Sequence, residues 1–244
     1  MSSNYRLHRT AVGVMVPAMA TDFATHVASN AVNRAILSRW DLLDLPGSWL
    51  VAGCLFQTVW NLRAGLRPES GIKDYDIFYF DPSDLSETAE AEAQAATESV
   101  LNDLGVTVEV ANQARVHLWY PAHFGYPYPA LARAEEGISR FLVRETCVGI
   151  RPQECYAPYG LSGLYAGTLT PNPATPYPEL FAKKVASYQA RWDWLKIEHA
   201  DGASTSNGLA VDLDAPHVHE AAPSMTAARQ EVCEADLVDA AQIG

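Results

Sequence analysis

The sequence has few cysteines, few basic residues and no long hydrophobic run. Only four of the 244 residues are cysteine, and no two of them show a Cys-x-x-Cys spacing. This argues against a structural zinc site and against a disulfide framework. No apolar run reaches the roughly 18 residues that a membrane-spanning helix needs. We therefore expect a cytoplasmic protein.

Acidic residues outnumber basic ones, and they are unevenly distributed. The chain has 17 Lys and Arg against 29 Asp and Glu, a net charge of −12. From Glu198 onward there are nine acidic residues and one basic residue, which leaves a net charge of −4 for the preceding 197 residues. No basic stripe suggests a long nucleic-acid footprint, although a local phosphate pocket is compatible with this composition.

The length suits one domain with appendages, or two small domains, and a hydrophobic content of 48% is enough for a sizeable core. We place the domain at residues 21–197. Residues 1–20 resemble a signal peptide in their basic start, but Gly13 and Pro17 interrupt the apolar run, so we expect an irregular N-terminal extension. Residues 198–244 are rich in Ala, Ser, Asp, Pro and Gly, which predicts a disordered acidic tail.

Hydrophobic periodicity predicts alternating helices and strands within the domain. The predicted helices are 21–45, 55–66, 84–105, 130–145 and 178–195. The predicted strands are 48–52, 77–80, 106–110, 147–151 and 154–157. This order indicates an α/β or α+β fold, a mixed sheet flanked by helices with a C-terminal helical portion.

Two carboxylates, Asp74 and Asp76, lead into the buried strand at residues 77–80. Alternate residues of a strand share a face, so both acids point the same way. They repel each other unless a cation lies between them, and Mg²⁺ prefers such oxygen ligands. A pattern this short also occurs by chance, in which case it serves only the solubility of a strand edge.

Glu109 and Gly53 are two further candidate site residues. Glu109 lies among valines within a predicted strand, where a carboxylate is costly unless it is paired or binds a metal. Gly53 lies between a predicted strand and a predicted helix, where free backbone N–H groups and the positive end of the helix dipole favour phosphate. An ordinary strand-to-helix turn is the alternative. Residues 112–120, rich in polar and aromatic side chains, fit a substrate wall or a strand end followed by a packed helix.

Six stretches of the chain carry a family resemblance. They are residues 52–61, 71–81, 108–120, 148–151, 156–161 and 181–195. Together they resemble a bacterial family of nucleotidyltransferases within the DNA polymerase β-like nucleotidyltransferase superfamily. The resemblance covers roughly residues 21–195 and is specific, because several long strings occur in the same order.

The resemblance implies a nucleotidyltransferase-like fold and a role for each candidate residue. Gly53 and Cys54 would meet the phosphates of a nucleoside triphosphate, and Asp74, Asp76 and Glu109 would bind Mg²⁺ or Mn²⁺. Lys184 and Arg151 would meet phosphate charge, or else have ordinary surface or structural roles. These candidate residues are Gly53, Cys54, Asp74, Asp76, Glu109, Arg151 and Lys184.

The sequence departs from the superfamily pattern at three places. Cys54 stands where Ser or Gly is usual, so only backbone N–H groups would serve the phosphates there. The interval from Gly53 to Asp74 is longer than usual, and Asp193 replaces a proline near the end of the last helix.

The implied reaction transfers a nucleoside monophosphate to a hydroxyl acceptor and releases pyrophosphate. The acceptor could be a small molecule, an RNA end or a protein side chain. The alternative is a non-catalytic nucleotide-binding or partner-binding module on the same fold. A sugar-nucleotide enzyme would need a longer chain with a sugar-binding half.

Overall fold

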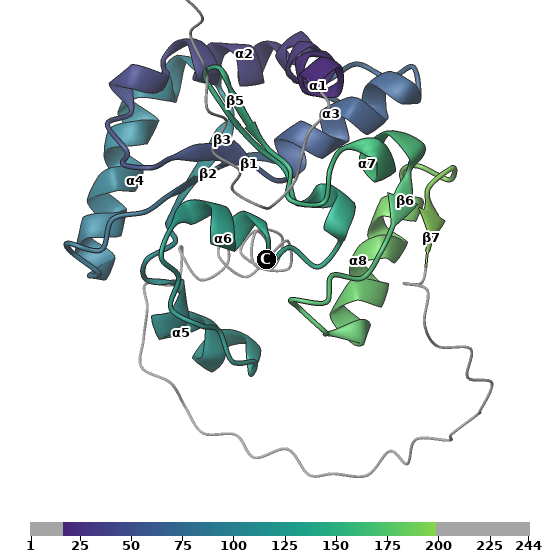
Figure 1. Cartoon of the computed structure of the whole chain (residues 1–244). Coiled ribbons are helices and arrows are strands. Elements are labelled where there is room, and N and C mark those ends of the chain that lie inside the picture. Colours follow the sequence, from purple (N-terminus) through teal and green to yellow (C-terminus); the bar gives the residue numbers. More distant parts are fainter. Residues whose placement is uncertain (1–16, 199–244) are drawn as a thin grey trace, which may run out of the picture.

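The computed structural model describes residues 17–198, which form a mixed five-stranded sheet flanked by helices (Figure 1). The helices are α1 (Pro17–Ser29), α2 (Ala31–Ser38), α3 (Gly53–Arg63), α4 (Glu87–Leu101), α5 (Val116–Phe124), α6 (Ala134–Ile138), α7 (Ser162–Ala166) and α8 (Pro178–Gln189), with 3₁₀ turns at Trp40–Leu42, Asn102–Leu104 and Arg144–Thr146. The strands are β1 (Trp49–Val51), β2 (Asp74–Tyr79), β3 (Thr107–Asn112), β4 (Gly149–Arg151), β5 (Glu154–Tyr156), β6 (Thr168–Leu169) and β7 (Lys196–Ile197).

Helix α1 begins at Pro17, inside the segment 1–20 that we predicted to lie outside the domain. The remainder of that segment, and the predicted tail from residue 199, lie outside the described residues. Within residues 17–198, no helix has both the length and the apolar character needed to cross a membrane.

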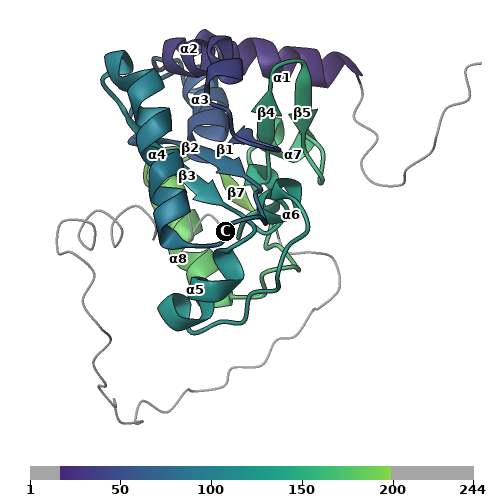
Figure 2. The same ribbon diagram turned by 90° about the vertical axis from the view of Figure 1, so that its left-hand side faces the viewer.

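The sheet has the strand order β3-β2-β1-β4-β5. Strand β1 is antiparallel to both β2 and β4, β4 and β5 form a hairpin, and β2 is parallel to β3. Parallel neighbours need a crossover connection, and α4 provides it, running beside β3 (Figure 2). Strands β6 and β7 pair separately and lie with α8 on the side of the molecule away from α4 (Figure 1).

The two faces of the sheet belong to different hydrophobic clusters. Leu50 and Ile77 point into the larger cluster, which they share with α1, α3 and α8. Trp49, Val51 and Phe78 point the other way, into a cluster that α6 covers. Because side chains alternate along a strand, the acids of β2 share the face of Phe78.

The single helix predicted at residues 21–45 is wrong, because the chain breaks at Asn30. The side chain of Asn30 accepts hydrogen bonds from the backbone N–H groups of Val32 and Asn33 and so caps a new helix, α2. Its amide nitrogen donates to Thr58 and Tyr75, and the side chain is fully buried. The break therefore satisfies a buried polar network that local periodicity does not reveal.

The helix predicted at residues 130–145 is also wrong over most of its length. Helix α6 has five residues, and the chain beyond it buries Phe141, Leu142 and Val143 in succession. An α-helix cannot direct three consecutive side chains inward from one stripe, and Val143 instead forms a β-bridge with Pro171.

The predicted last helix ends early. Helix α8 stops at Gln189, and the next residues turn back so that Gln189 Nε2 donates to the Leu195 carbonyl (3.0 Å). Trp192 and Leu195 remain buried even though they are not helical. The other predicted strands and helices are present with shifted ends, and the most consequential shift is that α3 begins at Gly53 itself.

Candidate active site

The turn between β1 and α3 holds its backbone in an unusual conformation. Ala52 has φ 61° and ψ −137°, a region that only glycine adopts readily, and α3 starts at the next residue. No side chain of the described residues caps this helix end. This end of α3 thus lacks a capping side chain, as is typical of helix starts that bind anions through their backbone N–H groups.

Gly53 has a specific steric requirement. A Cβ at this position would lie 2.7 Å from Nε2 of Gln57, one turn further along α3. Gln57 is itself largely buried. The glycine therefore allows the Gln57 amide to approach the start of the helix.

The thiol of Cys54 faces inward. It is fully buried and donates to the carbonyl of Val51 (3.2 Å). Burial raises the pKa of the Cys54 thiol well above its usual value, and the negative charges of Asp76 and Asp74 raise it further. The thiol is thus neutral. The sheet register separately pairs Asp76 with Val51, the last residue of β1 before the turn.

The three predicted acids are neighbours on one face of the sheet. Asp74 and Asp76 lie within β2 and are 6% and 2% exposed, and Glu109 on β3 is partly exposed. Asp76 is the register partner of both Val51 and Glu109, so it lies between the β1 end that leads to Gly53 and the third acid. The sheet register therefore brings the predicted carboxylates beside the predicted phosphate turn.

These acids do not form a preassembled metal site. Among residues 17–198, no group of three or more His, Cys, Asp or Glu side chains is placed to hold a metal ion. Mg²⁺ is usually bound by one or two carboxylates together with substrate phosphates and water, rather than by a cage of protein ligands. The donor chemistry of Asp74 and Asp76 fits an ion that shares its coordination with a nucleotide.

Lys184 on α8 is buried, and its amino group lies 5.5 Å from the centre of the Tyr188 ring. That ring packs edge-on against Phe56, in the first turn of α3, with centroids 5.4 Å apart. These contacts place Lys184 on the part of α8 that packs against the start of α3.

Arg151 lies elsewhere. It ends β4, where it pairs with Glu154 (2.6 Å) and stacks 4.3 Å from the centre of the Trp49 ring. Trp49 begins β1, and the Gly53 turn follows the other end of that strand. The structure therefore separates Arg151 from the turn, and its predicted phosphate contact stays a prediction.

A comparison with known protein families identifies the family of the chain. The sequence model of a family described as nucleotidyltransferase matches residues 38–197. The chain belongs to this nucleotidyltransferase family.

A solved structure supports the same fold. A protein described as containing a CCA-adding enzyme head domain, studied by NMR, superposes with a TM-score of 0.60 at 23% sequence identity. The match covers 74% of this chain and 96% of that chain. No curated protein matches the sequence significantly. The mixed sheet flanked by helices is thus a nucleotidyltransferase head-domain fold.

In this member of the nucleotidyltransferase family, the polar segment 112–120 ends a strand and begins a packed helix. The Asn112 amide exchanges hydrogen bonds with the backbone of Asp81, and Arg115 forms an ion pair with Glu90 on α4. Asn112 thereby joins β3 to the loop after β2, and Arg115 joins the start of α5 to α4. The structure thus shows the second of the two alternatives for this segment.

Sequence reasoning missed Arg191, which follows α8. Its Nη1 donates to Oε1 of Gln57, and its Nη2 donates to the carbonyl of Ser70 (2.9 Å). Gln57 and Arg191 are 134 residues apart, so no local pattern could indicate this contact.

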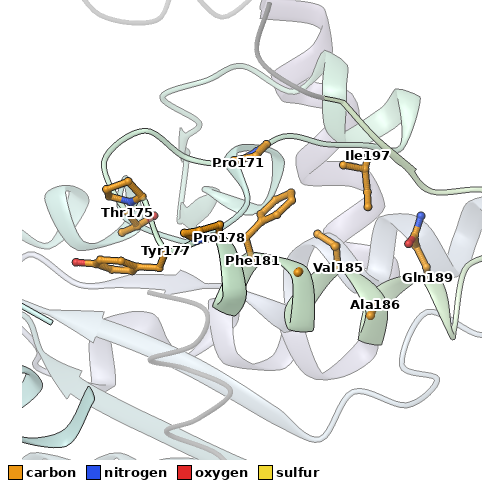
Figure 3. A pocket seen from close by; sticks show the side chains of 11 residues that line it. Pro171, Thr175, Tyr177, Pro178, Phe181, Val185, Ala186, Gln189 and Ile197 are labelled. Atoms are coloured by element: carbon orange, nitrogen blue, oxygen red, sulfur yellow. The ribbon is translucent and has the colours of Figure 1, made fainter. Parts of the chain in front are cut away.

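A separate cavity of about 630 Å³ lies over α8, between a proline-rich loop at residues 171–178 and β7 (Figure 3). Phe181, Val185 and Ile197 form much of its wall, and Thr175 and Tyr177 close one end. The described lining has no acidic or basic side chain. This cavity therefore lacks the groups that a metal-bound triphosphate needs.

Proposed function

We propose that this protein is a metal-dependent nucleotidyltransferase that moves a nucleoside monophosphate from a nucleoside triphosphate to a hydroxyl acceptor. The observation that carries the proposal is the buried Asp74 and Asp76 pair beside the α3 turn, within a chain of the nucleotidyltransferase family. A divalent ion bound by neighbouring carboxylates would offset their mutual repulsion, and this is the role that the proposal gives to the pair.

The proposed step is an in-line displacement at the α-phosphorus. The acceptor oxygen forms a bond to that phosphorus, the bond to the oxygen bridging the α- and β-phosphorus atoms breaks, and pyrophosphate leaves. Two Mg²⁺ or Mn²⁺ ions, when bound, would stabilise the attacking and leaving oxygens. Asp74 and Asp76 would hold the metal, and Glu109 would complete the ligands and accept the proton of the acceptor hydroxyl.

The remaining residues of the proposal orient the triphosphate. The backbone N–H groups of Gly53 and Cys54 would donate to phosphate oxygens at the helix start. Lys184 would supply a point charge from α8. These roles are supported by the positions of the turn and of α8, which packs against the first turn of α3.

The decisive experiment compares Asp76→Asn with the wild-type protein. We expect transfer to fall by about 100-fold or more, because metal stabilisation of this step contributes several kcal/mol. The measurement is release of pyrophosphate from each of the four triphosphates with Mg²⁺ or Mn²⁺, offered with acceptors of three classes: small hydroxyl compounds, RNA ends and protein. Asp84→Asn is a matched control, since Asp84 is an exposed carboxylate that bonds to the Ser86 backbone beyond the other end of β2.

Thermal melts separate catalysis from simple binding. A triphosphate at about 100 times its dissociation constant should stabilise the wild-type protein by roughly 2.7 kcal/mol. We expect this shift to require the metal and to disappear in Asp74→Asn. A stabilising shift without turnover of any acceptor would instead identify a nucleotide-binding module, and unchanged transfer by Asp76→Asn would refute the assigned site.

A further inference from the structure

The guanidinium of Arg191 is held beside Gln57, one turn into α3. Besides its bonds to Gln57 and to the Ser70 carbonyl, it lies 4.0 Å from the centre of the Trp192 ring. The side chain is nevertheless exposed to solvent. An exposed cation held by such contacts has lost much of its conformational freedom before any ligand arrives.

Two glycines show how closely this side chain borders the candidate site. A Cβ at Gly71 would lie 2.7 Å from Arg191 Nη2. A Cβ at Gly53 would lie 2.7 Å from the amide of Gln57, the side chain to which Arg191 donates. Arg191 therefore lies between Gln57, whose amide borders the α3 turn, and the loop that leads into Asp74.

We infer that Arg191 is a triphosphate-binding residue of this site, a deepening that rests on the proposed function. A triphosphate brings several negative charges to a site whose own acids are buried, and the thiol at the turn donates inward to Val51. A guanidinium offers a planar fork of donors that matches two phosphate oxygens at once. Gln57 is the positioning residue that orients this fork.

The test is a calorimetric titration of the full chain with inorganic tripolyphosphate and, separately, with nucleoside triphosphate, both with Mg²⁺. We expect Arg191→Gln to raise the dissociation constant for either ligand about 10- to 100-fold, as expected for a lost charge-assisted hydrogen-bond pair. Arg191→Lys should recover part of the affinity, because it restores the charge but not the fork.

Arg63→Gln is the matched control. Arg63 also stacks on a tryptophan, 3.8 Å from the centre of the Trp194 ring, and also donates to a backbone carbonyl, that of Tyr165. It lies at the other end of α3. Its replacement removes the same charge and the same kinds of contact, and we expect the dissociation constants to stay within about twofold of wild type.

The outcomes separate the two proposals. Wild-type protein that neither binds nor turns over any triphosphate would refute the proposed function. Wild-type protein that binds while Arg191→Gln binds equally well, or while Arg63→Gln weakens binding as much, would overturn the role of Arg191. If Arg191→Gln lowers the melting temperature, the Arg191→Lys protein decides between the outcomes. Weaker tripolyphosphate binding by Arg191→Lys at an unchanged melting temperature supports the inference. Unchanged binding by Arg191→Lys rejects it.

Discussion

Cys54 stands where Ser or Gly is usual, yet the turn before α3 can still offer its backbone to a ligand. A serine at this position would carry a hydroxyl that could meet phosphate, whereas the thiol donates inward to Val51 and is held neutral by burial. The turn can therefore offer its backbone to a ligand. This backbone includes Ala52 in a strained conformation. The next residue, Gly53, allows a direct test.

Gly53→Ala should separate ligand binding from stability. The added Cβ would meet the far end of the Gln57 side chain, which can move aside, so we expect the free energy of unfolding to change by less than about 1 kcal/mol. Moving Gln57 displaces the partner of Arg191, and we expect triphosphate affinity to fall about tenfold.

Calorimetry and urea unfolding of the Gly53→Ala protein measure the two quantities. Because both substitutions act on one network, the losses in Gly53→Ala and Arg191→Gln should be less than additive in the double variant. Full additivity would show that Gln57 does not link the turn to Arg191.

Helix α2 depends on one residue for its existence as a separate element. Asn30 supplies its cap and also bridges to α3 through Thr58 (3.1 Å) and to β2 through Tyr75 (3.3 Å). Burial raises the pKa of Tyr75 to about 12, so its hydroxyl stays neutral and needs a hydrogen-bond partner. The N-terminal helices are thereby joined to the elements that carry the site.

Asn30→Ala should lower the free energy of unfolding by about 2 to 3 kcal/mol. Loss of the cap accounts for about 1 kcal/mol, and the buried hydroxyls left without this partner account for the rest. Urea unfolding of Asn30→Ala beside Ser38→Ala, an exposed residue at the other end of α2, checks this. Equal effects of the two substitutions would mean that the buried network contributes little.

A cluster of aromatic rings between α3 and α8 packs the C-terminal part of the described chain against the rest of the molecule. Trp60 lies 5.3 Å from Tyr188 and 5.2 Å from Trp192, measured between ring centroids. This packing ties residues near the end of the described chain to the helix that begins at Gly53. The same packing fixes where Lys184 and Arg191 lie relative to α3, so we expect α8 and the sheet to unfold together.

Trp192→Ala should lower the free energy of unfolding by about 3 to 5 kcal/mol, because a 1% exposed indole is replaced by a cavity. Trp194→Ala, at a partly exposed ring, should cost less. Denaturation followed both by tryptophan fluorescence and by circular dichroism measures the change. Two separate transitions in the wild-type protein would contradict the view that α8 belongs to the same cooperative unit.

Local sequence determined those features that depend on periodicity and on residue type. The alternation of α3, β2, α4 and β3 follows from side-chain spacing, and the start of α4 follows from the Ser86 cap. The shared face of Asp74 and Asp76 follows from the twofold repeat of a strand. Each of these features depends only on residues that lie close together in the sequence.

Tertiary structure decided the features that depend on distant partners. The break at Asn30 exists because Tyr75, 45 residues away, needs its amide. The short α6 is followed by the pairing of Val143 with Pro171, and Arg191 is held against α3 because Gln57, 134 residues earlier, accepts its hydrogen bond. A local pattern cannot specify such contacts, because the energy that stabilises them appears only when separate elements pack together.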